Sequence, residues 1–363
     1  MHISQIYHHR RLLFALATPL LGVTSLLTPT LAAPSYHITD LGRLADVTEG
    51  AAIGLSNSGD VALTVMAGSH AHAAYWRQGR LKDLGQVSGY PNSIAFALNE
   101  HHVVVGWTSA GDNPVDSMAA TRAFVRDARG MRILGTLGGR DSRALGVNNA
   151  GRIVGVSNVD AHTRHAFVAD GATLKDLGVL PGGRFSAAYA VNAAGDAAGV
   201  ADTPLHINHP VIWRHGKIQD LGTLPGGGSG SALAINARGD AAGYSEAEDG
   251  IHAFLYRQGR MTDLGVLRYD PSMANSLNDR DEVVGSSNVS AHGRHAFLWR
   301  NGRMDDLNDL IPQDSGWTLS EGCAINNAGQ IVCIASSKGE PNHALLLTPT
   351  VNRPLPLGGK IKG

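Results

Sequence analysis

A short motif built around a leucine recurs through most of this sequence and constrains its fold more than any other feature. The motif is similar to Asp-Leu-Gly, and its leucines are Leu41, Leu84, Leu134, Leu177, Leu221, Leu264 and Leu307. Successive leucines are 43, 50, 43, 44, 43 and 43 residues apart. A period near 43 with several short strands per unit is typical of β-propellers, whereas helical solenoids need long amphipathic helices that this sequence lacks. The sequence therefore predicts an all-β chain, a seven-bladed β-propeller with four strands in each repeat.

The third repeat shows how a blade divides into strands. Its apolar and small-residue runs predict strands at residues 142–148, 152–157, 165–169 and 173–177. The first two strands are joined by Asn-x-x-Gly, which suits a three-residue hairpin with a left-handed glycine. In most repeats the last two are joined by Arg-x-Gly, another signal for a tight hairpin. The first strand is rich in small residues, so we place it nearest the crowded axis of the propeller.

The two ends of the repeat region complement each other. The last repeat stops after its third strand, at residues 343–347, while residues 36–42 form a lone fourth strand. If the N-terminal strand completes the last blade, the ring closes without an unpaired sheet edge. This closure predicts seven blades within residues 34–350.

Residues 1–33 are predicted to be a signal peptide. They contain a basic segment at residues 8–11 and an apolar run at residues 12–27, followed by small residues. A membrane anchor is the disfavoured alternative, because the apolar run is short and contains a proline and a glycine. We therefore expect an extracytoplasmic protein, secreted or periplasmic, exported by either the Sec or the twin-arginine route. The tail at residues 351–363 is expected to be disordered.

The charge balance argues against two classes of partner. The formal net charge is -1, the sequence pI is about 7.0 and only 17% of the residues are charged. Such a chain has no long-range field for nucleic acid or for an anionic membrane surface. It also contains no H-E-x-x-H, G-x-S-x-G or EF-hand motif. We therefore assign no catalytic residue, metal site or cofactor, and expect a monomer without a membrane span after signal cleavage.

The third strands carry a recognisable tripeptide. Residues 165–167, 252–254 and 295–297 all read His-Ala-Phe, with Leu-Gly-Gly or Leu-Pro-Gly-Gly segments nearby. Over residues 36–349 the chain resembles the HAF repeats of bacterial extracellular proteins. The resemblance implies an extracytoplasmic location and a repeat fold, but no particular activity. Arg122 in place of the histidine is one of several departures from the pattern.

The chain has two cysteines, Cys323 and Cys333, both in the seventh repeat. If residues 327–329 form the hairpin loop, the two side chains lie directly opposite each other. The position of Cys333 is usually glycine in the other repeats, so two facing positions have changed together. In an exported protein this predicts a disulfide, at the lower end of about 2–4 kcal/mol of stabilisation because its loop is short. The alternatives are a reactive thiol pair and half of a metal site, although neither Cys-x-x-Cys spacing nor a local histidine favours them.

A histidine begins the third strand in six repeats: His72, His165, His209, His252, His295 and His343. A ring of metal ligands is excluded by geometry, because third strands lie about 10 Å outside the innermost ones. Bonds from a metal to imidazole are only about 2.0–2.1 Å long. We expect instead a hydrogen bond within each blade, either to a backbone carbonyl or to the anchor aspartates Asp83, Asp176, Asp220, Asp263 and Asp306.

The loops that vary in length all open on one face of the predicted ring, which we call the long-loop face. Variable loops on a rigid scaffold are where binding function is usually placed. Exposed aromatic, arginine and histidine side chains there suit a glycan or a peptide. The candidate ligand-binding residues are Trp107, Arg140, His162, Arg164, Arg184, His292, Arg294 and Trp317. The alternative is that these are ordinary loop residues packed on their neighbours.

Two loops on this face are near duplicates, at residues 157–164 and 287–294. Their arginines, Arg164 and Arg294, could hold an anionic ligand as bidentate partners. Shared ancestry of the repeats is the alternative, and it requires no ligand.

Three functions remain open from the sequence. The first is a non-enzymatic interaction propeller outside the cytoplasm, whose partner is an unknown glycan, peptide or envelope protein. The second is a glycan-active lyase or hydrolase, which needs two carboxylates about 5–10 Å apart. The loop acids lie in different blades without a recognisable pairing. The third is a purely structural role in the envelope.

Overall fold

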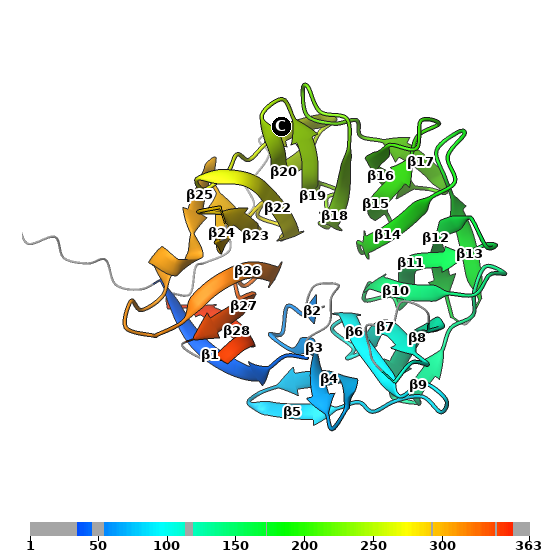
Figure 1. The fold of residues 1–363 in the computed structure, drawn as a ribbon, viewed down its shortest axis with the longest axis horizontal. Helices are drawn as coiled ribbons and strands as arrows, with labels where there is room; N and C mark the ends of the chain where they lie inside the picture. Colours follow the sequence, from blue (N-terminus) through cyan, green and yellow to red (C-terminus); the bar gives the residue numbers. More distant parts are fainter. Residues whose placement is uncertain are drawn as a thin grey trace, which may run out of the picture. The chain divides into compact units, whose positions relative to one another are not determined.

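The structure is a computed structural model that describes residues 35–45, 54–112, 119–171, 173–291, 293–337 and 340–350. These residues form seven four-stranded antiparallel sheets arranged as a ring (Figure 1). Strands and one short 3-10 helix are the regular elements of this described part, which contains no α-helix. The predicted seven-bladed β-propeller is thereby confirmed.

Each blade is a meander whose first strand lies nearest the centre of the ring. The strands of blades 1 and 2 are β2 (Gly54–Leu55), β3 (Val61–Ala67), β4 (His70–Arg77), β5 (Arg80–Asp83), β6 (Asn92–Leu98), β7 (Val104–Ser109), β8 (Thr121–Asp127) and β9 (Gly130–Ile133). Those of blades 3 and 4 are β10 (Ser142–Val147), β11 (Arg152–Asn158), β12 (Arg164–Asp170), β13 (Leu174–Gly178), β14 (Ser186–Val191), β15 (Ala197–Asp202), β16 (Asn208–Arg214) and β17 (Lys217–Asp220).

Blades 5 to 7 continue in the same order, and the 3-10 helix precedes the last blade. Their elements are β18 (Gly230–Ile235), β19 (Ala241–Ala247), β20 (Gly250–Arg257), β21 (Arg260–Asp263), β22 (Tyr269–Leu277), β23 (Val283–Asn288), β24 (Arg294–Arg300), β25 (Arg303–Asp306), η1 (Leu307–Leu310), β26 (Thr318–Ile325), β27 (Ile331–Ser337) and β28 (Glu340–Pro349). The strand bounds of blade 3 agree with the sequence prediction to within one residue at each end.

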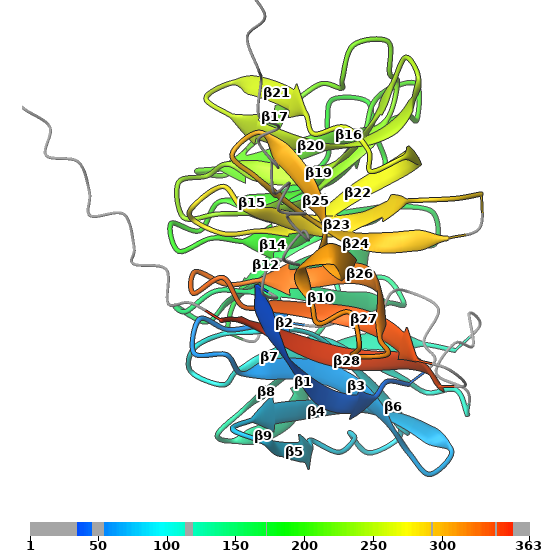
Figure 2. The same ribbon diagram turned by 90° about the vertical axis from the view of Figure 1, so that its left-hand side faces the viewer.

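Blade 7 is completed by the N-terminal strand β1 (Tyr36–Arg43), as predicted. Its strand order is β1-β28-β27-β26, and β1 pairs antiparallel with β28 from Tyr36 opposite Pro349 to Arg43 opposite His343. Figures 1 and 2 both show β1, in blue, beside β28, in red. The edge that would otherwise be left open is covered by a strand of the same chain, so the ring closes through backbone hydrogen bonds.

Phenylalanines of the third strands form the buried contacts between blades. Phe124, Phe167, Phe254 and Phe297 have no solvent exposure, and each packs into a core shared with the preceding blade. Burying a side chain of this size contributes roughly 1.5–3 kcal/mol. The His-Ala-Phe tripeptide is therefore a packing unit of the ring.

The six repeated histidines of the third strands, three of which belong to that tripeptide, each bond to an aspartate, which was one of the two partners left open by the sequence. In six blades the histidine Nδ1 lies 2.6–3.1 Å from a carboxylate oxygen. In blade 7 the pair is His343 with Asp40, so it joins β28 to the N-terminal strand. Blade 2 has Arg122 and Ile133 at the two positions, so both members of the pair are replaced together.

Serines of the first strands connect neighbouring blades. Ser186 Oγ accepts the Ala166 N–H at 2.8 Å and donates to the Gly178 carbonyl at 2.7 Å, both in the preceding blade. Between blades 4 and 5 the corresponding residues are Pro210 and Gly230. Proline has no N–H to donate, and glycine has no hydroxyl to receive it, so both halves of the contact are missing together.

A ring of asparagines joins the hairpins that follow the first strands. The Nδ2 groups of Asn99, Asn148, Asn192, Asn236, Asn278 and Asn326 each donate to a backbone carbonyl of the next blade, at 2.8–3.4 Å. Blade 1 has Ser56 at this position. There the Glu100 carboxylate accepts the N–H groups of Asn57 and Ser58 instead. We call this side of the propeller the asparagine face; the long-loop face lies opposite.

The prediction of a disulfide between Cys323 and Cys333 is wrong, because the two residues are not paired opposite each other. Both cysteines are free thiols, and Gly322 rather than Cys323 lies opposite Cys333. The reason is a β-bulge in the first strand, which recurs at this place in blades 2 to 7 and inserts an extra residue into the pairing. Cys323 occupies the bulge and packs toward blade 1, whereas Cys333 packs toward blade 6.

The predicted signal peptide at residues 1–33 and the predicted disordered tail at residues 351–363 lie outside the described residues. Within the described residues, no helix has the length and apolar character needed to cross a bilayer.

Candidate functional site

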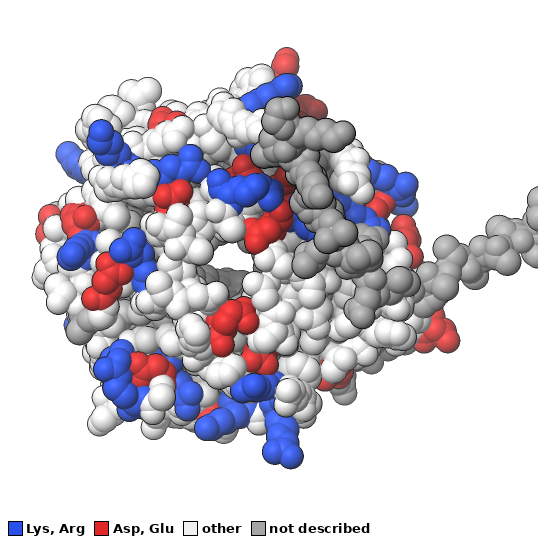
Figure 3. Space-filling model, turned by 180° about the vertical axis from the view of Figure 1, so that it is seen from behind, with Lys and Arg blue, Asp and Glu red and all other residues white. Residues whose placement is uncertain are grey.

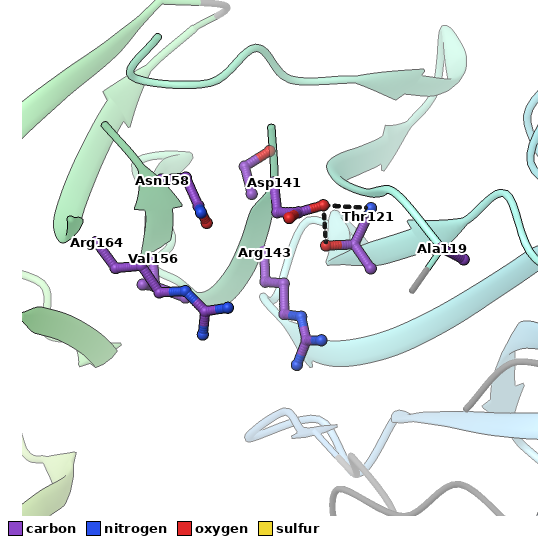
Figure 4. A pocket seen from close by; sticks show the side chains of 8 residues that line it. Ala119, Thr121, Asp141, Arg143, Val156, Asn158 and Arg164 are labelled. Atoms are coloured by element: carbon purple, nitrogen blue, oxygen red, sulfur yellow. Dashed lines mark hydrogen bonds between the residues drawn. The ribbon is translucent and has the colours of Figure 1, made fainter. Parts of the chain in front are cut away.

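A small cavity opens on the long-loop face where the ends of four strands meet. It has a volume of about 100 Å³ and is lined by Ala119, Thr121, Asp141, Ser142, Arg143, Val156, Asn158 and Arg164. These residues belong to blades 2 and 3 (Figure 4). Strand ends converge here because every second connection of a meander returns to the same face. We call this cavity the arginine pocket.

The floor of the arginine pocket is ordered by one carboxylate. Asp141 Oδ1 accepts the Thr121 N–H at 2.8 Å and lies 3.4 Å from the Thr121 hydroxyl (Figure 4). The Asp141 carbonyl accepts the Asn158 N–H at 2.8 Å. These contacts tie blade 2 to blade 3 and leave the guanidinium groups of Arg143 and Arg164 on the same side of the pocket.

Arg143 is a site residue that the sequence analysis missed. Its guanidinium carbon lies 4.7 Å from the centre of the Trp107 ring, a cation–π contact between blades 3 and 2. A signal for it was available, because the other repeats have an uncharged residue at this place in the first strand, except for Glu321 in the last. A charged side chain in an innermost strand marks a position that packing alone does not explain.

Trp107 corrects an expectation. The sequence analysis placed it among exposed ligand-binding side chains, but its exposure is 5%. It lies in the middle of β7, between Ile94 and Ala123 on the flanking strands, where the pleat turns the side chain into the interface between blades. Trp107 therefore packs between the blades and contacts the Arg143 guanidinium, and it is not an exposed ligand-binding side chain.

The two near-duplicate loops differ in what their arginines contact. Arg294 Nη2 lies 2.7 Å from Glu321 Oε2 of the next blade, so its charge is neutralised. Arg164 is exposed and faces no such carboxylate, because Ala187 occupies the position of Glu321 in the repeat. Of the two predicted anion-binding arginines, the structure brings only Arg164 into the arginine pocket.

Two more arginines lie near the arginine pocket: Arg184 is close to Arg164, and Arg140 precedes Asp141 in the chain. The Arg164 N–H donates to the Arg184 carbonyl at 3.3 Å, and the Arg184 N–H donates to Asp202 Oδ1 at 2.7 Å. Both Arg140 and Arg184 are exposed. Four arginines thus gather around one sector of the long-loop face, which favours an anionic ligand there.

The remaining candidates lie apart from this cluster or outside the described residues. His162 is exposed at a loop tip, where its backbone N–H donates to Asp160 at 2.7 Å. This N–H and the hydroxyl of the next residue hold the pKa of Asp160 below its usual range. Trp317 is half-buried in blade 7, with its ring centre 5.1 Å from that of His343. His292 lies outside the described residues.

The arrangement also bears on metal binding and on catalysis by paired carboxylates. Among the described residues, no group of three or more histidine, cysteine, aspartate or glutamate side chains is placed to hold a metal ion. The six repeated histidines of the third strands, from His72 to His343, are instead each paired with an aspartate of their own blade, as described above. The only carboxylate among the described lining residues of the arginine pocket is Asp141.

Comparisons with known proteins support the fold alone. No protein-family profile and no curated protein matches this chain. The β-propeller domain of the Trilobed protease from Pyrococcus furiosus, which has an open velcro topology, is 9% identical, with 88% of this chain and 99% of that one covered at a TM-score of 0.52. A puromycin hydrolase mutant complexed with PGG is 13% identical, with 82% of this chain and 50% of that one covered at a TM-score of 0.51. This chain thus spans half the length of that hydrolase.

Proposed function

We propose that this chain is an exported β-propeller interaction protein whose long-loop face binds an anionic group of a glycan or a peptide. The observation that carries the proposal is Arg164. Its guanidinium lies at an ordered pocket beside Arg143 and forms no ion pair with a carboxylate of the described residues, while its repeat equivalent Arg294 is ion-paired. A planar guanidinium suits bidentate recognition of carboxylate, sulfate or phosphate.

Export and family membership are part of the same proposal. Support for export comes from the leader-like residues 1–33, and support for the HAF-repeat family comes from the recurring tripeptide. Secretion is tested by expressing the full chain with and without residues 1–33 and locating it by cell fractionation. Retention of both forms in the cytoplasm would contradict export.

Binding is tested on a glycan array and a peptide array with the parent chain and two single variants. Arg164→Ala should weaken binding to anionic probes by about 10-fold or more, because charge-assisted hydrogen bonds contribute about 1.5–3 kcal/mol. Arg294→Ala is the matched control: it should keep binding and lose at most about 1 kcal/mol of stability, as expected for an exposed ion pair. Equal losses of binding in the two variants, or no anionic probe bound by the parent, would contradict the proposal.

The enzyme alternative is kept as an outcome of the same experiment. Glycoside hydrolysis needs two carboxylates flanking the bond, and the described lining of the arginine pocket supplies Asp141 alone. Turnover of a bound glycan that disappears in Asp141→Asn would replace the binding proposal by an enzymatic one.

A further inference from the structure

We propose that the hollow at the centre of the asparagine face is a second binding site, specific for an aliphatic ammonium group. The cavity has a volume of about 370 Å³ and is lined by residues of all seven blades. Figure 3 shows this face, with the opening at its centre. This volume falls within the range of roughly 300–1,000 Å³ that is typical of small-molecule sites.

The lining of the cavity combines many polar groups with a ring of aliphatic side chains. Each blade contributes one aliphatic side chain, from the residue before the asparagine position: Leu55, Leu98, Val147, Val191, Ile235, Leu277 and Ile325. The asparagine amides beside them are already bonded to the next blade. A hydrocarbon stem that enters the cavity would pack against this aliphatic ring.

The rim of the cavity is acidic. Its lining residues include Glu100 and Asp279 but no lysine or arginine. Figure 3 shows acidic atoms on two sides of the opening. The Glu100 carboxylate accepts the N–H groups of Asn57 and Ser58, at 2.6 and 3.2 Å, which are uncharged donors.

The second rim carboxylate, Asp279, also accepts hydrogen bonds from uncharged donors. Its carboxylate accepts the Ala237 N–H at 2.9 Å and the Asn327 amide at 2.6 Å. The nearby Arg238 is ion-paired with Asp240 and Asp281, and its guanidinium also donates to the backbone carbonyl of Asp279, not to its carboxylate. Among the described residues, neither rim carboxylate forms an ion pair.

A ring of aliphatic side chains together with an acidic rim matches a hydrocarbon stem that ends in a protonated amine. The stem would pack against the aliphatic residues and the ammonium would bind at one of the two rim carboxylates. This chemistry occurs in free alkylamines and in the lysine side chain of a peptide. The two sources are distinguished by experiment.

Binding is measured by calorimetry on the full chain, with n-pentylammonium as the free amine and the peptide Ac-Gly-Lys-Gly-NH2 as the lysine source. Whichever source fits should bind at least about 10-fold more tightly than two controls. Pentan-1-ol has the stem without the charge, and methylammonium has the charge without the stem. If neither probe binds, or pentan-1-ol binds as tightly as the amine, the proposal is overturned.

Variants separate the ring of aliphatic side chains from the rim. Val191→Phe should narrow the hollow and weaken binding, and Glu100→Gln should weaken it about 5-fold through loss of one rim charge. Asp249→Asn removes a carboxylate that is 77% exposed on the long-loop face and should leave binding unchanged. Because Glu100 also connects blades 1 and 2, folding is checked by thermal unfolding. Unchanged binding in Val191→Phe would overturn the proposal whatever the stability of Glu100→Gln.

Discussion

The asparagine ring offers a stability prediction that separates contacts within a blade from contacts between blades. Asn192 is buried, and its two side-chain atoms have different partners. Oδ1 accepts the Asp196 N–H of its own hairpin at 2.9 Å, and Nδ2 donates to the Asn236 carbonyl of the next blade at 3.1 Å. Blade 1 supplies a natural comparison, because Ser56 Oγ accepts the N–H four residues later at 3.0 Å but makes no bond to the next blade that corresponds to Nδ2.

Asn192→Ser should therefore remove only the bond between blades, and Asn192→Ala should remove both. The Asn236 carbonyl also accepts the Gly239 N–H at 3.0 Å, so it is not left unpaired, and the serine variant should lose about 1 kcal/mol. The alanine variant also leaves the Asp196 N–H without its acceptor and should lose about 2–3 kcal/mol. These losses correspond to roughly 2 °C and 5 °C in melting temperature.

The assay is urea unfolding followed by circular dichroism and tryptophan fluorescence, since coincident transitions show that one free energy of unfolding applies. Asn158→Ala is the control, because its amide makes only a 3.5 Å exposed contact and should change stability by less than about 0.5 kcal/mol. If Asn192→Ser is as stable as the parent while Asn192→Ala is not, the bond between blades contributes nothing and the reasoning is refuted.

Three further predictions concern acid stability, the serine contacts and the thiols. Burial raises the pKa of Asp127, but hydrogen bonds led by that of Arg132 outweigh burial and bring the pKa to about 2. The ionised Asp127 therefore stabilises the folded protein above the ordinary pKa near 4, and this stabilisation is lost as pH falls toward 2. NMR titration should show a higher pKa in Arg132→Ala, and an unchanged value would contradict the assigned cause. Ser186→Ala removes both of its bonds to the preceding blade and should cost about 1–3 kcal/mol in urea unfolding, whereas a neutral effect would deny those bonds a role. Burial raises the pKa of Cys323 and of Cys333 well above the usual value, so both thiols should resist alkylation in the native protein. Because both are free, both should react after unfolding without reductant. If mass spectrometry shows neither cysteine labelled after unfolding, a disulfide has formed.

Much of the fold could be predicted because its signals are local and repeated. The Asn-x-x-Gly and Arg-x-Gly hairpins specify turns of two or three residues, and turn length sets strand register in a meander. The short last repeat and the lone N-terminal strand identified the closure at β1 and β28. An error in predicting one hairpin does not affect the others, because each repeat contains the same pattern.

The site was less predictable, since its chemistry depends on which side chains of adjacent blades face each other. Arg164 and Arg294 have nearly identical local sequences, yet only Arg294 meets a glutamate, because the next blade has Glu321 in one case and Ala187 in the other. Trp107 reads as a loop aromatic but lies inside a strand.

The sequence by itself thus determined the seven blades, their strands and the closure of the ring, because backbone hydrogen bonding and turn geometry act over a few residues. Tertiary structure alone decided which side chains pair across blades. The bulge that separates Cys323 from Cys333 depends on how two strands of one blade pair, and the bond from the Asn192 amide to the Asn236 carbonyl depends on how two blades pack. Neither is visible in a local sequence pattern.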